Sequence, residues 1–379
     1  MKMNNPKNLR TWIEIDSHSA RRNCDTFRKI IGPKVKLWAV VKSNAYGHGI
    51  LVFSKLVAKW VDGFCVDSLI EGLRLREAGI KKPILVLGPT LPALYGEAAK
   101  NKVTITISNF DALKSLAAAE NPPEFHIKID TGMHRQGFYV NELPRVIRFL
   151  NQRLNVKCQK TLVGIYTHFA SAKDINYPTY TEKQFAEFQK AVKLFEKAGY
   201  KNLVKHAAAT GATLIDKKYH LDAVRVGIGL YGLWPSKELE TQLGNKIHLR
   251  PVLSWHAVIS EIKKLKSGDY VGYDLVERVN RDTKMAVLPI GYWHGFPRSL
   301  SGTGEIIVDG HRARVLGRVS MDLLVVDAGG MNCRTGDAAV IIGKDGDSEL
   351  AVAEIAAKSG TTHYEFLTRL NPLIERVIK

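Results

Sequence analysis

The chain has 379 residues, of which 45% are hydrophobic and 24% charged, with a formal net charge of +18. Its length predicts two domains, or one barrel with a smaller module, and its composition is that of a soluble globular protein. Lysines and arginines are spread along the whole chain, without a basic tail or an aromatic nucleic-acid motif. We therefore expect a solvated basic surface and no nucleic-acid partner.

The opening residues "MKMNNPKNLRTW" hold no apolar signal segment, and no apolar run reaches membrane-spanning length. The four cysteines, at positions 24, 65, 158 and 333, form no C-x-x-C pair. These features predict a cytoplasmic protein with reduced thiols, no membrane segment, no disulfide framework and no metal site.

The first strand signal is "TWIEID" at 11–16, which could pair with either domain. Eight apolar, β-branched runs then alternate with amphipathic stretches, as buried parallel strands do. These runs lie at 36–42, 63–67, 83–88, 103–108, 124–130, 162–170, 203–209 and 223–232, and the clearest helical patterns lie at 69–79, 109–120 (with Asn109 as a cap) and 180–199. This order predicts an α/β fold with an N-terminal (β/α)8 TIM barrel. A doubly wound sheet is disfavoured because no glycine-rich dinucleotide fingerprint follows the first run.

Beyond about residue 250 the pattern changes to short strands separated by Gly and Asp turns. The clearest lie at 284–293, 304–317, 322–330 and 338–343. We therefore expect residues 1–245 to form the barrel and 246–379 to form a mainly antiparallel β domain, with the first residues able to pair with that second domain.

Several polar residues follow the predicted barrel strands, where the active sites of such barrels lie. They are Lys42, Arg135, His168, Thr210 and Arg225. From its own surroundings, Lys42 could be a solvated strand end or an amine that forms a Schiff base with a carbonyl. Together, these basic residues and the glycine-flanked amides after Arg225 suit a phosphorylated cofactor that carries an aldehyde.

Seven motifs resemble those of the bacterial alanine racemases, in the same order. They are "AVVKSNAYGHG", "IKIDTGMHRQGF", "THFASAKD", "VRVGIGLYG", "GDYVGY", "LPIGYWHGFPR" and "GRVSMD". The resemblance runs from "TWIEID" to "YEFLTRLNPLIERV" and favours the Schiff-base interpretation of Lys42. It implies a barrel that binds pyridoxal 5'-phosphate (PLP), a C-terminal β domain and a head-to-tail homodimer with shared active sites.

The resemblance also implies roles for single residues. Lys42 would bind PLP as a Schiff base and act as the base on one face of the substrate α-carbon. Tyr273 of the opposite subunit would be the base on the other face, hydrogen-bonded by His168. Arg225 would face the pyridine nitrogen and, because an arginine cannot give up its proton, would leave that nitrogen unprotonated. The matched phosphate-binding positions are Tyr46, Thr210, Gly227 and Ile228, and those near the substrate carboxylate are Arg135, with Met321 and Asp322 from the opposite subunit.

The chain departs from the family pattern at Pro372, where members often carry a tyrosine that helps to hold the phosphate. A proline has neither a hydroxyl nor a backbone N–H, so the phosphate loses a donor and the pocket could accept larger side chains. Lys128 matches a lysine that is carbamylated in some members, but we do not predict the modification here.

The sequence thus predicts an enzyme that interconverts L- and D-alanine and supplies D-alanine for peptidoglycan. A serine, lysine or broad-specificity racemase is the near alternative, kept open by Pro372. A PLP-dependent decarboxylase lacks motif support. A non-catalytic PLP-binding protein is more remote, because it would not need the second domain.

Overall fold

The computed structural model describes residues 8–153, 161–174 and 176–379, so Cys158 lies outside the described residues. The chain divides into two compact units. The barrel unit comprises His18–Ala45 and Phe53–Arg250, and the C-terminal unit comprises Met1–Ser17, Tyr46–Val52 and Pro251–Lys379. None of the described helices is both long and apolar enough to cross a membrane.

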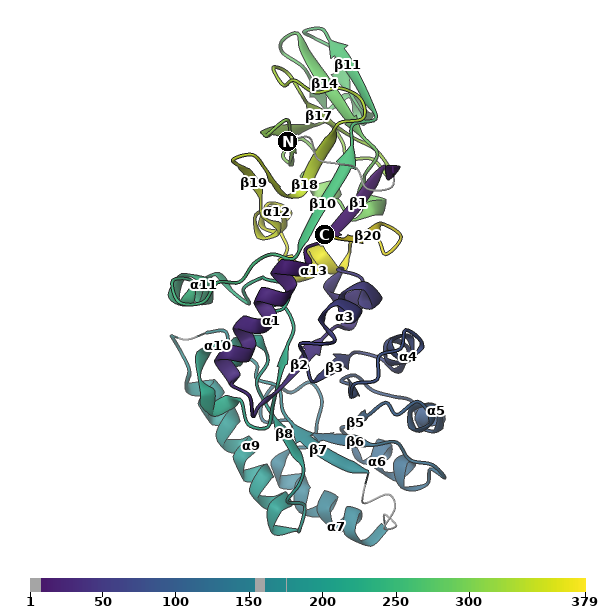
Figure 1. Cartoon of the computed structure of the whole chain (residues 1–379), viewed down its shortest axis with the longest axis vertical. Coiled ribbons are helices and arrows are strands. Elements are labelled where there is room, and N and C mark those ends of the chain that lie inside the picture. The colour runs from purple at the N-terminus through teal and green to yellow at the C-terminus, as the bar shows by residue number, and fades with distance from the viewer. Residues whose placement is uncertain (1–7, 154–160, 175) are drawn as a thin grey trace. The chain divides into compact units, whose positions relative to one another are not determined.

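The barrel unit is a closed ring of eight parallel strands, several of which are labelled in Figure 1. They are β2 (Lys36–Val40), β3 (Gly63–Val66), β4 (Ile84–Val86), β5 (Ile105–Ile107), β6 (Phe125–Lys128), β7 (Leu162–Tyr166), β8 (Val204–His206) and β9 (Ala223–Val226). Two four-stranded sheets, β4-β3-β2-β9 and β5-β6-β7-β8, are joined by the parallel bridges Leu85–Thr104 and Ala209–Arg225. The eight predicted strands and the TIM barrel are therefore confirmed.

The helices of this unit alternate with its strands, as Figure 1 shows. They are α1 (Ser17–Ile31), α2 (Lys42–Tyr46), α3 (Ile50–Val57), α4 (Leu69–Glu77), α5 (Tyr95–Lys100), α6 (Phe110–Ala117), α7 (Leu143–Arg153), α9 (Thr179–Lys197), α10 (Thr210–Ile215) and α11 (Lys237–Leu243). The three predicted helices appear as α4, α6 and α9. Asn109 caps α6 as predicted, because its Oδ1 accepts a hydrogen bond from the backbone N–H of Ala112 at 2.8 Å.

The C-terminal unit is built on a mainly antiparallel sheet, as predicted. Its main path runs β11-β14-β17-β16-β15-β18-β10-β1-β20. The strands are β1 (Thr11–Ile15), β10 (Leu253–Val258), β11 (Glu261–Leu265), β14 (Thr283–Leu288), β15 (Glu305–Val308), β16 (His311–Leu316), β17 (Leu324–Asp327), β18 (Ala338–Asp345), β19 (Ser348–Leu350) and β20 (Glu375–Ile378), with the separate pair β12 (Tyr270–Val271) and β13 (Glu277–Arg278) and the helices α12 (Val352–Lys358) and α13 (His363–Thr368). The opening strand β1 lies between β10 and β20, so "TWIEID" belongs to this sheet.

The turn directly after β2 is left-handed. Ser43, Asn44, Ala45 and Tyr46 all have φ between 51° and 55°. Each such residue costs about 1–2 kcal/mol, because its Cβ crowds the following carbonyl oxygen. The turn is held by the hydrogen bond from the Ala45 N–H to the Val41 oxygen (2.9 Å) and by that from the Ser43 N–H to Oε1 of Glu71 (2.6 Å).

The segment that follows this turn is anchored in the C-terminal unit. Arg376 donates from Nε and Nη2 to the carbonyl oxygen of Gly47, at 3.2 and 2.9 Å. A Cβ at Gly47 would lie 2.0 Å from the carbonyl oxygen of Leu367, and the φ of Gly47 is +83°. Only glycine fits this position, because both the space and the backbone conformation exclude a side chain.

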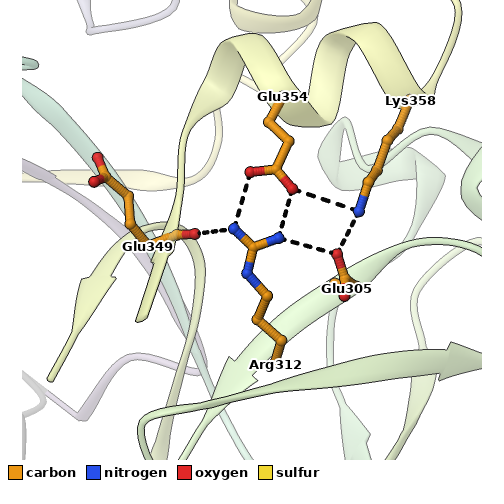
Figure 2. A network of polar contacts seen from close by, with 5 residues as sticks. All are labelled: Glu305, Arg312, Glu349, Glu354 and Lys358. Atoms are coloured by element: carbon orange, nitrogen blue, oxygen red, sulfur yellow. Dashed lines mark hydrogen bonds and ion pairs between the residues drawn. The ribbon is translucent and has the colours of Figure 1, made fainter. Parts of the chain in front are cut away.

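A network of charged side chains joins strands β15 and β16 to helix α12 and strand β19 (Figure 2). Arg312 donates to both carboxylate oxygens of Glu354, at 2.5 and 3.0 Å, and to Glu305 at 3.2 Å. It also donates to the carbonyl oxygen of Glu349 at 2.5 Å, and Lys358 contacts both Glu305 and Glu354. Because the side chains share partners, the entropy lost when one side chain is fixed is offset by several contacts at once.

We expect the β-branched substitution Ser43→Val to lower the free energy of unfolding by about 1 kcal/mol, because a branched Cβ is strained at positive φ. Ser43 is exposed, so Ser43→Ala is the matched control and should change stability by less than about 0.5 kcal/mol. Urea unfolding measures both. Equal effects of the two variants would mean that the left-handed turn is not under strain.

We expect Arg312→Leu to lower the free energy of unfolding by about 1 kcal/mol at low salt, because it removes a bidentate pair within a network. The loss should shrink in about 1 M NaCl, where exposed charges are screened. Arg334, whose one ion pair among the described residues is with Asp337 at 3.5 Å, gives the control Arg334→Leu, with an expected loss below about 0.5 kcal/mol. Losses of equal size would contradict the role of the network.

Candidate functional site

Lys42 lies directly after β2, at the carboxyl end of the barrel strands. Its Nζ is 3.2 Å from Oδ1 of Asp67, which follows the neighbouring strand β3. Glu71 joins the two strand ends, since its carboxylate accepts from the N–H of Ser43 at 2.6 Å and from that of Asp67 at 2.8 Å. The Lys42 side chain is 37% exposed, so the barrel presents its amine to a ligand.

Arg225, on β9, is 2% exposed and makes five hydrogen bonds, all to neutral groups. Its Nη1 donates to Nδ1 and to the carbonyl oxygen of His206, at 2.6 and 3.2 Å. Its Nη2 donates to the carbonyl oxygens of Thr167 and Ala207, at 2.8 and 3.0 Å, and to Nδ1 of His168 at 3.3 Å. Within the described part of the chain, no carboxylate accepts a hydrogen bond from this guanidinium.

Asp222, three residues before Arg225, forms no ion pair with it in the described part of the chain. Asp222 instead accepts from the backbone N–H of Lys205 at 2.8 Å. A buried charge without a counter-ion costs several kcal/mol, even when its hydrogen bonds are satisfied. The arrangement therefore favours a bound anion or another acceptor at this end of the barrel.

His206 and Tyr166 complete the surroundings of Arg225 and were not among the predicted site residues. The two rings stack at 4.8 Å with an interplanar angle of 6°. The guanidinium carbon of Arg225 lies 5.1 Å from the centre of the Tyr166 ring, which provides a cation–π contact. Both residues end barrel strands, β8 and β7, so a search of strand ends could have found them.

The mouth of the barrel unit is cationic. Desolvation and the positive charges of Arg225, Arg135, Lys128 and Lys42 lower the pKa of His168 to about 3. Desolvation, Arg135 and Arg225 also lower the pKa of Lys128 to about 8. The Nζ of Lys128 donates to Oε1 of Gln136 at 2.9 Å. Four neighbouring cations around a neutral imidazole make this a site for an anionic ligand.

The loop that carries Arg135 is organised by Asp130. Oδ1 of Asp130 accepts from the N–H groups of Gly132, Met133 and His134, at 2.9 to 3.0 Å. Its Oδ2 accepts from the N–H of Arg135 at 3.1 Å. Burial raises the pKa of this carboxyl, but the backbone hydrogen bonds outweigh burial and the net shift is downward. Asp130 therefore shapes the loop as a carboxylate.

Thr210 connects two of the predicted phosphate-binding segments. It begins α10, and its hydroxyl oxygen accepts from the N–H of Gly227 at 3.1 Å and from that of Gly229 at 3.5 Å. Ile228, between these glycines, is 2% exposed. A Cβ at Gly229 would lie 2.4 Å from the Phe27 ring, so the close packing of this turn requires glycine.

The remaining predicted residues lie in the C-terminal unit. Tyr273 is 68% exposed and Met321 54% exposed. Their loops lie together, since Nε of Arg318 donates to Asp274 at 2.9 Å and a Cβ built on Gly272 would lie 3.6 Å from the backbone nitrogen of Arg318. Asp322 and Pro372 are also exposed, while the Tyr46 ring lies 6.2 Å from that of Tyr364.

The described residues contain no group of three or more His, Cys, Asp or Glu side chains that could hold a metal ion. The donors present instead suit an anionic cofactor with an aldehyde: the accessible amine of Lys42, the cations around His168, and the Thr210 hydroxyl beside the Gly227–Ile228 turn. All five hydrogen bonds of Arg225 leave from Nη1 and Nη2, so Nε–H is the donor that remains for a ligand.

Both parts of the chain match models of one protein family. Residues 15–235 match the alanine racemase N-terminal domain, and residues 252–378 match the alanine racemase C-terminal domain. An alanine racemase of Leptospira interrogans is 36% identical over 379 residues, which cover 97% of this chain and 95% of that protein. Alanine racemase 1 of Bacillus subtilis is 35% identical over 371 residues, with 97% and 92% covered.

Solved structures show the same similarity. The alanine racemase of Bacillus anthracis, determined with bound L-Ala-P, superposes with a TM-score of 0.91 at 32% identity and covers 99% of this chain and 96% of its own. That of E. faecalis superposes with a TM-score of 0.88 at 29% identity and covers both chains completely. The matches extend over both units, and the chain therefore belongs to the alanine racemase family.

Proposed function

We propose that the protein is a PLP-dependent racemase that interconverts L- and D-alanine. The observation that carries this proposal is the accessible amine of Lys42 at a cationic barrel mouth, where the hydrogen bonds of the buried Arg225 go to neutral groups among the described residues. The names of its relatives support alanine as the substrate. The physiological role that we propose is the supply of D-alanine for peptidoglycan, made in the cytoplasm.

When bound to Lys42, PLP would supply an electron sink for negative charge at the α-carbon. Arg225 would donate from Nε to the ring nitrogen without transferring a proton, because an arginine stays charged. Thr210, Gly227, Ile228 and Tyr46 would hold the phosphate through hydroxyl and amide groups. Lys42 would take or return the α-proton on one face of the substrate.

A second base must serve the other face, because one base that returns its proton to the same face regenerates the same enantiomer. We assign this role to Tyr273 from a second subunit. Its hydroxyl is on a side chain that is 68% exposed in the single chain, where no apolar surroundings could exclude water. His168, held neutral with a pKa of about 3, would hydrogen-bond this tyrosine.

Exposed apolar side chains near Tyr273 support a homodimer with shared sites. Leu275, Trp293, Met321 and Leu323 are 48–64% exposed, and all belong to the C-terminal unit. Large exposed apolar groups of this kind are typical of interaction surfaces. In this dimer, Met321 and Asp322 of one subunit would approach the substrate carboxylate bound by Arg135 of the other.

The substrate range is open to a broader preference because of Pro372. This residue offers no donor, so one phosphate contact is missing and the pocket wall changes. A serine, lysine or broad-specificity racemase is therefore the second candidate. A protein that only binds PLP is disfavoured by the second unit that carries Tyr273.

The function is tested by incubating the holoenzyme with L-alanine in D₂O and following chirality together with the α-proton signal. We expect both to change, and Tyr273→Phe to slow the reaction from L-alanine by about 10²-fold or more, because it removes a general acid–base group. Serine and lysine are tested in parallel. Exchange without inversion would contradict the role of Tyr273, and no change with alanine would contradict alanine as the substrate.

A shared site predicts complementation between two inactive variants. When Lys42→Ala and Tyr273→Phe are unfolded together and refolded as a mixture, heterodimers form, and each has one site with both native residues. About one quarter of all sites should then be complete, so about one quarter of the native activity should return. Each variant refolded alone is the control. No recovery from a mixture that contains heterodimers would mean that Lys42 and Tyr273 of the same chain form the site.

A further inference from the structure

A second buried histidine, His126 on β6, extends the hydrogen-bonded chain behind Arg225. Nδ1 of His126 lies 2.8 Å from Nε2 of His206, whose Nδ1 lies 2.6 Å from Nη1 of Arg225. His126 is 3% exposed, His206 is fully buried and Arg225 is 2% exposed. Neither the sequence motifs nor the proposed reaction uses His126.

The direction of each bond in this chain follows from elementary chemistry. Arginine has no acceptor, so Nδ1 of His206 must offer its lone pair to Arg225. Burial and the charge of Arg225 lower the pKa of both histidines, that of His126 to about 3, so both rings are neutral. Neutral His206 therefore carries its proton on Nε2 and donates it to Nδ1 of His126. In the opposite tautomer, the Nδ1–H of His206 would face the Nη1–H of Arg225, and no hydrogen bond could form between them.

The His126 ring fits inside the barrel because the neighbouring strand has a glycine, Gly164, beside it. A Cβ at Gly164, on the neighbouring strand β7, would lie 2.4 Å from Cε1 of His126. The pairing of β6 with β7 also shifts register between Phe125 and His126. A glycine inside a strand weakens that strand. Gly164 is nevertheless needed here, because any side chain at this position would collide with the His126 ring. The Trp38 ring lies against both histidines, at 5.8 Å from His126 and 4.9 Å from His206.

We propose that His126 is a positioning residue: it selects the Nε2–H tautomer of His206 and thereby fixes the guanidinium of Arg225. The part that concerns catalysis rests on the proposed racemase function, in which Arg225 faces the cofactor ring nitrogen. Without an acceptor at position 126, the buried Nε2–H of His206 is left without a partner, which offsets the preference that Arg225 imposes and allows the other tautomer to be populated. In the wrong tautomer, Nη1 of Arg225 loses its 2.6 Å bond and the guanidinium turns away.

A matched pair of variants tests this proposal. Asparagine and leucine have nearly the same shape, but only the asparagine side chain can accept the proton of His206. We compare His126→Asn with His126→Leu, and identify the His206 signals with His206→Gln. The first measurement is the histidine tautomer, from ¹⁵N NMR of the cofactor-free protein with labelled histidine, which depends on no catalytic assumption.

We expect His206 to carry its proton on Nε2 in the native protein and in His126→Asn, and to populate the other tautomer in His126→Leu. In the holoenzyme, His126→Leu should lower kcat about 10–100-fold, as loss of an orienting partner does elsewhere, while His126→Asn retains most of the native kcat.

An Nδ1–H tautomer of His206 in the native protein would overturn the proposal, even if His126→Leu does not fold. Equal kcat values of the two variants would overturn its catalytic part. If His206 carries its proton on Nε2 but the protein does not racemise alanine, the proposed function is refuted and the proposal about the tautomer is not.

Discussion

The buried guanidinium of Arg225 is the interaction on which the barrel mouth depends. Its charge is solvated by carbonyl oxygens and two imidazoles, with no carboxylate partner among the described residues. Burial, together with this charge, keeps His168 and His206 neutral, and the charge makes the mouth attractive to anions. A carboxylate beside Arg225 would cancel the attraction for anions. The neutral partners thus set the electrostatics that a phosphorylated cofactor and an amino-acid carboxylate require.

A second constraint acts on the backbone beside Lys42. Four consecutive residues after this lysine are left-handed, and the hydrogen bond from Ser43 to Glu71 helps to hold them. Backbone strain of this kind persists only where the surrounding structure imposes it, and it concentrates at functional sites. Here Glu71 also holds Asp67, the ion-pair partner of Lys42. The strained turn and the position of the amine are therefore parts of one arrangement.

Much of the fold could be predicted because the parallel strands are apolar at nearly every position and helices separate them. The candidate residues at strand ends followed from the same rule: Arg225 lies in β9, and the others lie shortly after the carboxyl ends of β2, β7 and β8 (Lys42, His168 and Thr210). The contacts of Arg225 could not be predicted, since an arginine at a strand end pairs as well with Asp222 as with a histidine. His206 ends strand β8, so a search of strand ends could have found it, whereas His126 lies inside β6 and its position gave no indication of a role at the site.

By itself, the sequence determined the order of the strands, the two-part organisation and the family, because hydrophobic periodicity and contiguous motifs are local properties of the chain. Only the tertiary structure decided where the side chains of Arg225, His206 and His126 meet, because these residues come from three strands that closure of the barrel brings together. The tertiary structure also decided that β1 joins the C-terminal sheet, since the sequence of a short apolar strand does not specify which strand it pairs with. Hydrogen-bond direction and tautomer follow from that packing, and so does the charge at the site.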